Sequence, residues 1–108
     1  MVKYYVLKGH EPILEPDLLT WAHWLETSDP ARIVAHTKVS NQTEVSTVFL
    51  GLDHSFGDGP SLLFETMIFG GRQDGYQKRY PTWVDAEAGH TQAVRLAKRD
   101  IKRGLNGN

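Results

Sequence analysis

The hydrophobic residues of the chain repeat at two different spacings, one typical of strands and the other typical of helices. Val2 to Leu7 is rich in β-forming residues and predicts a short strand that ends at Gly9. From Ala31 to Val39 the side chains alternate with a period of two, and Ser40 to Thr43 has the composition of a turn, which predicts a hairpin. Its second strand, Glu44 to Leu52, is apolar on both faces and is therefore expected in the middle of a sheet.

A further strand, a turn and an edge strand complete the predicted sheet. Leu62 to Phe69 is again strongly apolar, and Gly70 to Gly75 carries glycine and aspartate, as a turn requires. Tyr76 to Tyr80 is shorter and more polar, which is typical of a strand at the edge of a sheet. Consecutive strands joined in this way predict an antiparallel meander of about four to five strands.

A short helix is predicted between the first strand and the hairpin. Pro12 and Pro16 indicate an irregular connector. Asp17 is a residue type that caps helix N-termini, and Leu18 to Glu26 repeats apolar residues at helical spacing. Ser28, Asp29 and Pro30 then end the helix. Its expected buried face consists of Leu18, Trp21, Ala22 and Leu25.

The C-terminal segment has the clearest helical pattern. Thr82 and Asp85 have the spacing of a capping box directly after Pro81, which predicts a helix from Trp83 to about Arg103. The residues expected on its buried face are Trp83, Ala86, His90, Ala93, Val94, Ala97 and Ile101. Gly104 to Asn108 is predicted to be a frayed tail. Together the elements predict one α+β domain over residues 1–108, with the long helix packed across one face of the sheet.

The composition fits one ordinary soluble domain and removes several classes of protein. With 108 residues, 40% of them hydrophobic and 23% charged, the chain can build its own core, so stability requires no cofactor. The absence of cysteine excludes disulfides, thiolate metal sites and thiol nucleophiles. No apolar run approaches the roughly 18 residues that span a bilayer, and the N-terminal segment lacks a signal-peptide pattern, so a cytoplasmic protein is expected. The formal net charge is -1, so no overall field favours nucleic acid or a membrane.

The loop between the two central strands is the first candidate binding site. From Asp53 to Ser61 it is longer than the roughly two to five residues of usual hairpin loops. Its carboxylate, imidazole and backbone N–H groups could meet a metal ion or an anion, but their spacing matches no metal or phosphate motif. Two other interpretations are a solvated turn and a loop that binds a macromolecule with Phe56 as its exposed anchor. The candidate residues are Asp53, His54, Ser55, Phe56, Asp58 and Gly59.

Glu65 and His90 form the second candidate site. Strand alternation puts Glu65 on an apolar strand face, where a carboxylate needs a partner or a raised pKa. His90 lies on the expected buried face of the long helix, so the two could meet as a buried acid/base couple. The competing interpretations are a hydrogen-bonded core histidine and a carboxylate that faces solvent. No nucleophile or ligand cluster accompanies the two residues, so catalysis is not the leading expectation.

Aromatic and basic residues suggest a third surface. Three tryptophans and four tyrosines could stack on bases, although packing in the core is the commoner use of such residues. Cations near the end of the long helix could contact phosphates, but the helix dipole favours them there in any case, and an acidic partner protein suits them equally. This basic stripe consists of Arg95, Lys98, Arg99, Lys102 and Arg103.

One long motif and several shorter stretches of the chain together form a recognisable pattern. The central motif comprises Val45 to Gly57, Gly59-Pro60, Leu63 to Met67 and Phe69 to Gly71. The shorter stretches are Tyr5 to Leu7, Gly9-His10, Asp17 to Ala22, Arg79-Tyr80, Thr82-Trp83 and Glu87 to His90. These stretches resemble a family of small bacteriophage and prophage proteins to which no activity is assigned, and the likeness covers most of the chain, from about Tyr4 to Val94. Ser61 departs from the family's pattern, which has a second proline there, and this makes the loop a little less rigid.

The resemblance implies a phage gene product in the cytoplasm of an infected bacterium, and it implies no catalytic residue. Small phage proteins without enzymatic motifs often act by binding, so we expect a non-catalytic inhibitor of a host defence system such as CRISPR. Its partner would be a host or phage protein, met through the loop Asp53 to Ser61 and the edge strand Tyr76 to Tyr80. One alternative is nucleic-acid binding through the basic stripe. The other is a small-ligand, nucleotide or metal-binding protein that uses Asp53, His54, Glu65 and His90.

Overall fold

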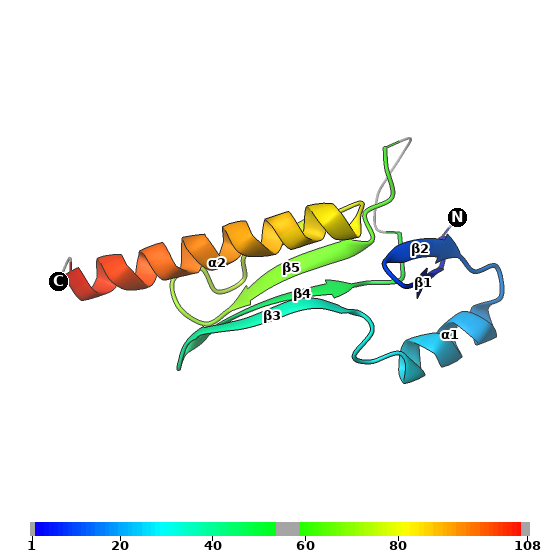
Figure 1. Ribbon diagram of the computed structural model, residues 1–108, viewed down its shortest axis with the longest axis horizontal. Coiled ribbons are helices and arrows are strands. Elements are labelled where there is room, and N and C mark those ends of the chain that lie inside the picture. The colour runs from blue at the N-terminus through cyan, green and yellow to red at the C-terminus, as the bar shows by residue number, and fades with distance from the viewer. Residues whose placement is uncertain (1, 54–58, 107–108) are drawn as a thin grey trace.

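A long helix lies across one face of an antiparallel sheet, and a small hairpin and a short helix stand at one end of that sheet (Figure 1). The computed structural model describes residues 2–53 and 59–106. In chain order the elements are β1 (Tyr5–Lys8), β2 (Glu11–Leu14), α1 (Leu18–Thr27), β3 (Ile33–Ser40), β4 (Thr43–Phe49), β5 (Phe64–Phe69), β6 (Gln77–Tyr80) and α2 (Trp83–Asn106). This is the α+β architecture that the sequence predicts.

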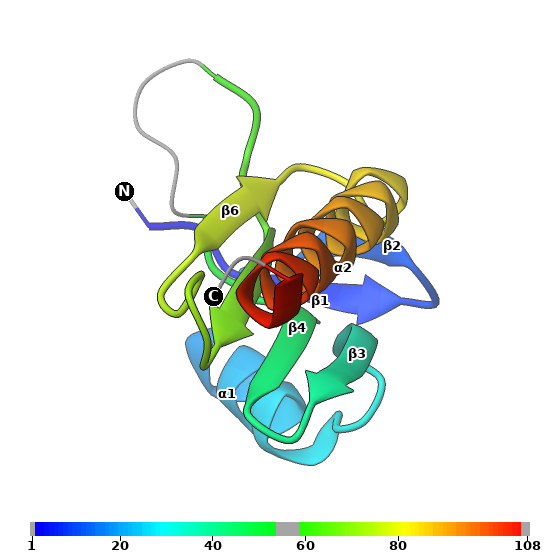
Figure 2. The ribbon, with the colours of Figure 1, turned by 90° about the vertical axis from the view of Figure 1, so that its left-hand side faces the viewer.

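Strands β3 to β6 pair in chain order as one antiparallel sheet, which confirms the predicted meander. Val45 pairs with Ile68 and Thr47 pairs with Thr66, so these four side chains point to the same face. That face packs against α2, which runs over all four strands (Figure 2). The largest fully buried side chains are those of Val45, Thr47, Phe49, Phe64, Thr66 and Ile68.

The buried face of α2 agrees with the helical pattern of the sequence. The backbone N–H of Asp85 donates to the Thr82 hydroxyl at 3.0 Å, so the predicted cap forms. The helix continues to Asn106, past its predicted end at about Arg103, because a glycine lowers helix propensity by only about 1 kcal/mol and does not block propagation. That the tail from Gly104 is frayed stays a prediction. In the described part of the chain no helix is both long and apolar enough to cross a membrane. The buried residues of α2 include Trp83, Ala86, His90, Ala93 and Ala97.

A second strand occupies the segment around Pro12, where the sequence predicts a connector. Gly9 and His10 form a two-residue turn between β1 and β2, and Gly9 has a φ of 60°. Glycine at the first position of such a turn is typical of the type II′ hairpin. Pro12 is tolerated because β2 is an edge strand, where a missing N–H costs little. The hairpin joins the larger sheet where the Tyr5 N–H donates to the Gly51 carbonyl at 2.8 Å.

The two central strands end before the loop that joins them. β4 stops at Phe49 and not at Leu52, and β5 starts at Phe64 and not at Leu62. Gly51 has a φ of 79°, which leads the chain out of the sheet and toward the hairpin.

Two turns at the opposite end of the sheet approach each other so closely that only glycine fits between them. A Cβ on Gly70 would lie 1.7 Å from the backbone oxygen of Gln42, and a Cβ on Gly71 would lie 2.6 Å from Thr43 Oγ1. Both glycines also have positive φ, 85° and 73°. The glycine pair after β5 therefore allows the β3–β4 turn to pack against it.

Helix α1 has its predicted cap, but its apolar face is only half-buried. The Asp17 carboxylate accepts the Thr20 backbone N–H at 2.9 Å. No residue of α1 is buried, and Leu18, which the pattern places on the buried face, is 51% exposed. Trp24 packs against the core and meets the Phe49 ring edge-on.

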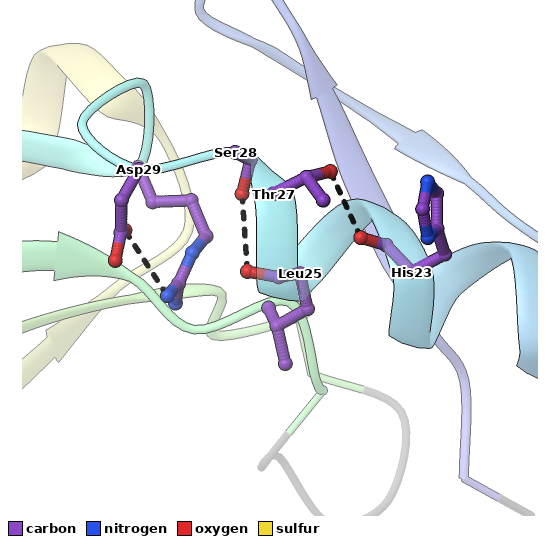
Figure 3. Close-up of polar contacts among 6 residues, drawn as sticks. His23, Leu25, Thr27, Ser28 and Asp29 are labelled. Atoms are coloured by element: carbon purple, nitrogen blue, oxygen red, sulfur yellow. Dashed lines mark hydrogen bonds and ion pairs between the residues drawn. The ribbon is translucent and has the colours of Figure 1, made fainter.

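Hydroxyl groups mark the end of α1. The Thr27 hydroxyl donates to the His23 carbonyl at 2.9 Å, and the Ser28 hydroxyl donates to the Leu25 carbonyl at 3.4 Å (Figure 3). These bonds satisfy two of the carbonyls that lack partners at a helix C-terminus. The helix therefore ends at Thr27, directly before the segment up to Pro30 that the sequence predicts to end it.

Candidate functional site

His90 is the centre of a buried polar cluster between α2 and the sheet. It is 6% exposed, its Nε2 lies 2.8 Å from Thr37 Oγ1, and its Nδ1 lies 2.8 Å from Thr47 Oγ1. Thr47 Oγ1 in turn lies 2.5 Å from Thr66 Oγ1. Burial, with a smaller contribution from nearby His36, lowers the pKa of His90 from its ordinary value of 6.5. The imidazole is therefore neutral at neutral pH, with one nitrogen donating and the other accepting.

Glu65 is buried as well, at 9% exposed, but its partners lie on β6. Its carboxylate accepts Arg79 Nε at 2.9 Å and also accepts a hydrogen bond from Gln77 Nε2. Arg79 stands directly opposite Glu65 in the strand register. The partner that a buried carboxylate requires is thus a cation on the neighbouring strand.

Glu65 and His90 do not meet, which corrects the buried pair expected from the sequence. Thr66 reaches Thr47 beneath α2, and its neighbour Glu65 therefore points to the opposite face of the sheet. Each of the two side chains is satisfied by its own partners, so they form no acid/base couple. Among the side chains that the structure describes, no three of His, Asp or Glu gather as a metal site requires.

The described part of the predicted binding loop consists of its two ends. The Ser61 hydroxyl donates to Asp53 Oδ2 at 2.8 Å, which ties these ends together. Gly59 is exposed, and a Cβ built on it would meet no atom within 4 Å. The candidates that lie outside the described residues are His54, Ser55, Phe56 and Asp58. The role of this loop stays a prediction.

Three residues of the basic stripe lie on the solvent side of α2. Arg95, Lys98 and Arg99 are exposed. The side chains of Lys102 and Arg103 lie outside the described part of the structure. Contact with phosphates or with an acidic protein surface stays a prediction.

The sheet face that points away from α2 forms a surface that we call the open face. Among the described elements only α2 packs extensively on β3 to β6, and α1 lies beyond the end of these strands, against β1 (Figure 1). By register and alternation the open face consists of Ile33, His36, Lys38, Glu44, Ser46, Val48, Glu65, Met67, Phe69, Gln77 and Arg79.

An apolar strip crosses the open face between charged pairs. Phe69 is 48% exposed, and Met67 and Val48 are half-buried. The ion pair between β5 and β6 borders the strip on one side. On the other side His36 Nε2 lies 3.4 Å from Glu44 Oε2. This surface therefore combines exposed apolar area with a polar border.

A cleft of about 590 Å³ opens between the β1–β2 hairpin and the start of α2. Its walls include Tyr5 and Lys8 of β1, Glu11 of β2, and Trp83 and Glu87 of α2. Its volume lies in the range of about 300–1,000 Å³ that is usual for small-molecule sites. Tyr5 and Trp83 are among the aromatic residues that the sequence offers for stacking on bases, whereas Lys8, Glu11 and Glu87 belong to no candidate site predicted from the sequence.

An aromatic stack stands in this cleft. The His10 and Trp83 ring centroids are 3.7 Å apart, and the ring planes differ by 4°. Trp83 also meets Phe64 edge-on at 6.0 Å, which anchors it in the core. Its Nε1 is buried and has no hydrogen-bond acceptor among the described residues. The only sequence signal for this stack is the Gly9-His10 turn, which places an imidazole at the hairpin tip.

Comparison with known proteins assigns no function to the chain. No known protein family, no curated protein and no solved structure matches the chain. The likeness to phage proteins therefore stays a resemblance between stretches of sequence.

Proposed function

We propose that the protein acts by binding a partner protein through the open face of its sheet. The observation that supports the proposal is the apolar strip of Phe69, Met67 and Val48, on a face that no described element covers extensively. Single exposed apolar residues are ordinary, but an apolar strip with a charged border is a common feature of protein interfaces. Half-exposed aromatic residues such as Phe69 are suited to anchor such contacts.

The edge of the sheet gives a partner a second means of attachment. β6 is an edge strand, in the position that the sequence predicts for Tyr76 to Tyr80. A partner on the open face can therefore add a strand beside β6 through main-chain hydrogen bonds. The exposed cation Lys78 on this strand disfavours unselective pairing, so a partner with acidic residues opposite it is favoured.

The resemblance to phage proteins supplies the proposed setting. In that setting the partner is a component of a bacterial defence system, and the protein inhibits it by occupying a surface, without catalysis. This step rests on the resemblance and on the binding surface together, because a fold by itself does not specify a function.

Phe69→Asp tests the proposal. The substitution puts a charge in the apolar strip, and Phe69 is exposed enough for the fold to survive. Loss of an interface anchor costs about 2 kcal/mol or more of binding free energy, so affinity for the partner should fall about thirtyfold. Capture of the partner from a lysate of infected bacteria should fall accordingly. The measurement is affinity capture with a tagged protein, accompanied by thermal unfolding of each variant.

Leu19→Asp is the matched control, because Leu19 is 78% exposed on α1 and receives the same change of charge. It should leave capture unchanged. Equal capture by both variants would remove the open face from the proposal. Capture that disappears after nuclease treatment would favour the basic stripe and nucleic acid instead.

A further inference from the structure

The cleft between the hairpin and α2 already holds one flat ring against another. The His10 imidazole lies parallel to the Trp83 indole at 3.7 Å, a full face-to-face contact. Trp83 is 9% exposed and fixed by the core, whereas His10 is exposed at the tip of a two-residue turn. The outer face of the imidazole therefore offers a planar, solvent-accessible platform, and stacking on such platforms is tolerant of ring type.

The charged groups around this platform have both signs. Lys8 supplies an exposed ammonium group, and the first turn of α2 adds the positive end of the helix dipole. Glu11 and Glu87 supply exposed carboxylates, which can only accept hydrogen bonds. A ligand that complements all of these groups has a planar ring with N–H donors and carries an anionic tail.

We propose that this cleft binds a mononucleotide whose base carries an amino group. The base stacks on the outer face of His10 and extends the stack on Trp83, the phosphate pairs with Lys8, and the carboxylates accept hydrogen bonds from the base and the ribose. A cleft of about 590 Å³ has room for such a ligand. An arginine side chain of a partner protein also suits the rings and carboxylates, but it leaves Lys8 without a counter-charge.

This site is separate from the open face, so the proposal does not depend on the proposed binding of a partner protein. The cleft lies at the hairpin end of the molecule and involves β1, β2 and α2, whereas the open face belongs to β3 to β6. Phe69→Asp should therefore leave nucleotide binding intact. Either proposal can fail while the other stands.

The test is titration of the ¹⁵N-labelled protein with GMP, AMP, CMP and UMP at millimolar concentrations. The indole N–H resonance of Trp83, assigned with Trp83→Phe, should shift saturably, and UMP, whose base has no amino group, should bind most weakly. His10→Ala should weaken GMP binding about tenfold, because a stacked base contributes roughly 1–3 kcal/mol. His10→Phe, which keeps a flat ring, should retain binding.

Two controls separate this site from general effects. His23→Ala removes an exposed histidine from α1 and should not change GMP binding. Lys8→Glu should weaken binding of GMP and leave binding of guanosine unchanged, since only the nucleotide has the phosphate. No saturable shift with any nucleotide would overturn the proposal, and so would binding of arginine amide in preference to GMP.

Discussion

A neutral histidine in the core makes the stability of this protein depend on pH. Burial lowers the pKa of His90 in the folded state, while the unfolded chain retains the ordinary value of 6.5. Between these two pKa values the unfolded state binds more protons, so the free energy of unfolding decreases as the pH falls. The contribution of neutral His90 to the free energy of unfolding is fully present above pH 6.5. Each unit of difference between its unfolded and folded pKa corresponds to about 1.4 kcal/mol.

Replacement of His90 by glutamine should remove much of this pH dependence. The free energy of unfolding of the natural protein, measured by urea denaturation, should fall as the pH is lowered from neutral through 6.5, and that of His90→Gln should fall less. His23→Gln, which changes an exposed histidine, should keep the natural slope. An identical slope in the natural protein and His90→Gln would show that His90 is not the titrating group.

The sequence predicts the burial of individual residues better than their partners. His90 and Glu65 are both buried, as their positions in a helical and an alternating pattern indicate. Strand alternation does not say which sheet face the helix covers, however, and the two residues lie on opposite faces. The His10–Trp83 stack joins residues far apart in the chain, so no local pattern could reveal it.

Helix α2 approaches β6 so closely that one position in it must be glycine. A Cβ on Gly89 would lie 2.1 Å from Tyr80 Cζ and 2.2 Å from its hydroxyl oxygen. Tyr80 is buried, and the ring has little room to move. Glycine in a helix interior costs about 1 kcal/mol relative to alanine, and here that cost permits the helix to lie flat on the sheet.

Gly89→Ala should therefore destabilise the protein although alanine is the better helix former. Overpacking at a buried contact costs about 1–3 kcal/mol, which exceeds the gain in helix propensity. Ala88→Gly, at the neighbouring exposed position, should lower the free energy of unfolding by only about 1 kcal/mol.

Tyr80→Leu identifies the cause of this effect. In its presence Gly89→Ala should cost clearly less than in the natural protein, because the atoms that the new Cβ meets are gone. Additive costs in the double variant would show that the Tyr80 ring is not the obstacle.

Periodicity identifies the long elements and fails for the shortest ones. The hairpin β3–β4, the strand β5 and the helix α2 each extend over several periods, and their existence and order could be predicted. β2 has only four residues and contains Pro12, which indicates a connector, although the Gly9-His10 turn before it is typical of a hairpin. α1 shows the reverse problem, because its apolar spacing predicts a buried face that the fold leaves half-exposed.

Burial is unevenly distributed over the whole molecule. The largest fully buried side chains all belong to β4 and β5, whereas α1 has no buried residue. The principal contacts of α1 within the described part of the chain are with β1. Because the resistance of an element to local opening follows its buried contacts, α1 should open independently of the sheet.

Native-state hydrogen exchange measures this difference, and Asp17→Ala sharpens it. The amides of β4 and β5 should exchange most slowly, through global unfolding, and those of α1 much faster, through local opening. Asp17 caps α1, and loss of a cap costs about 1 kcal/mol, so Asp17→Ala should speed exchange in α1 about fivefold. If α1 opens by itself, exchange in β5 stays unchanged. Equal acceleration in β5 would mean that α1 and the sheet unfold as one cooperative unit.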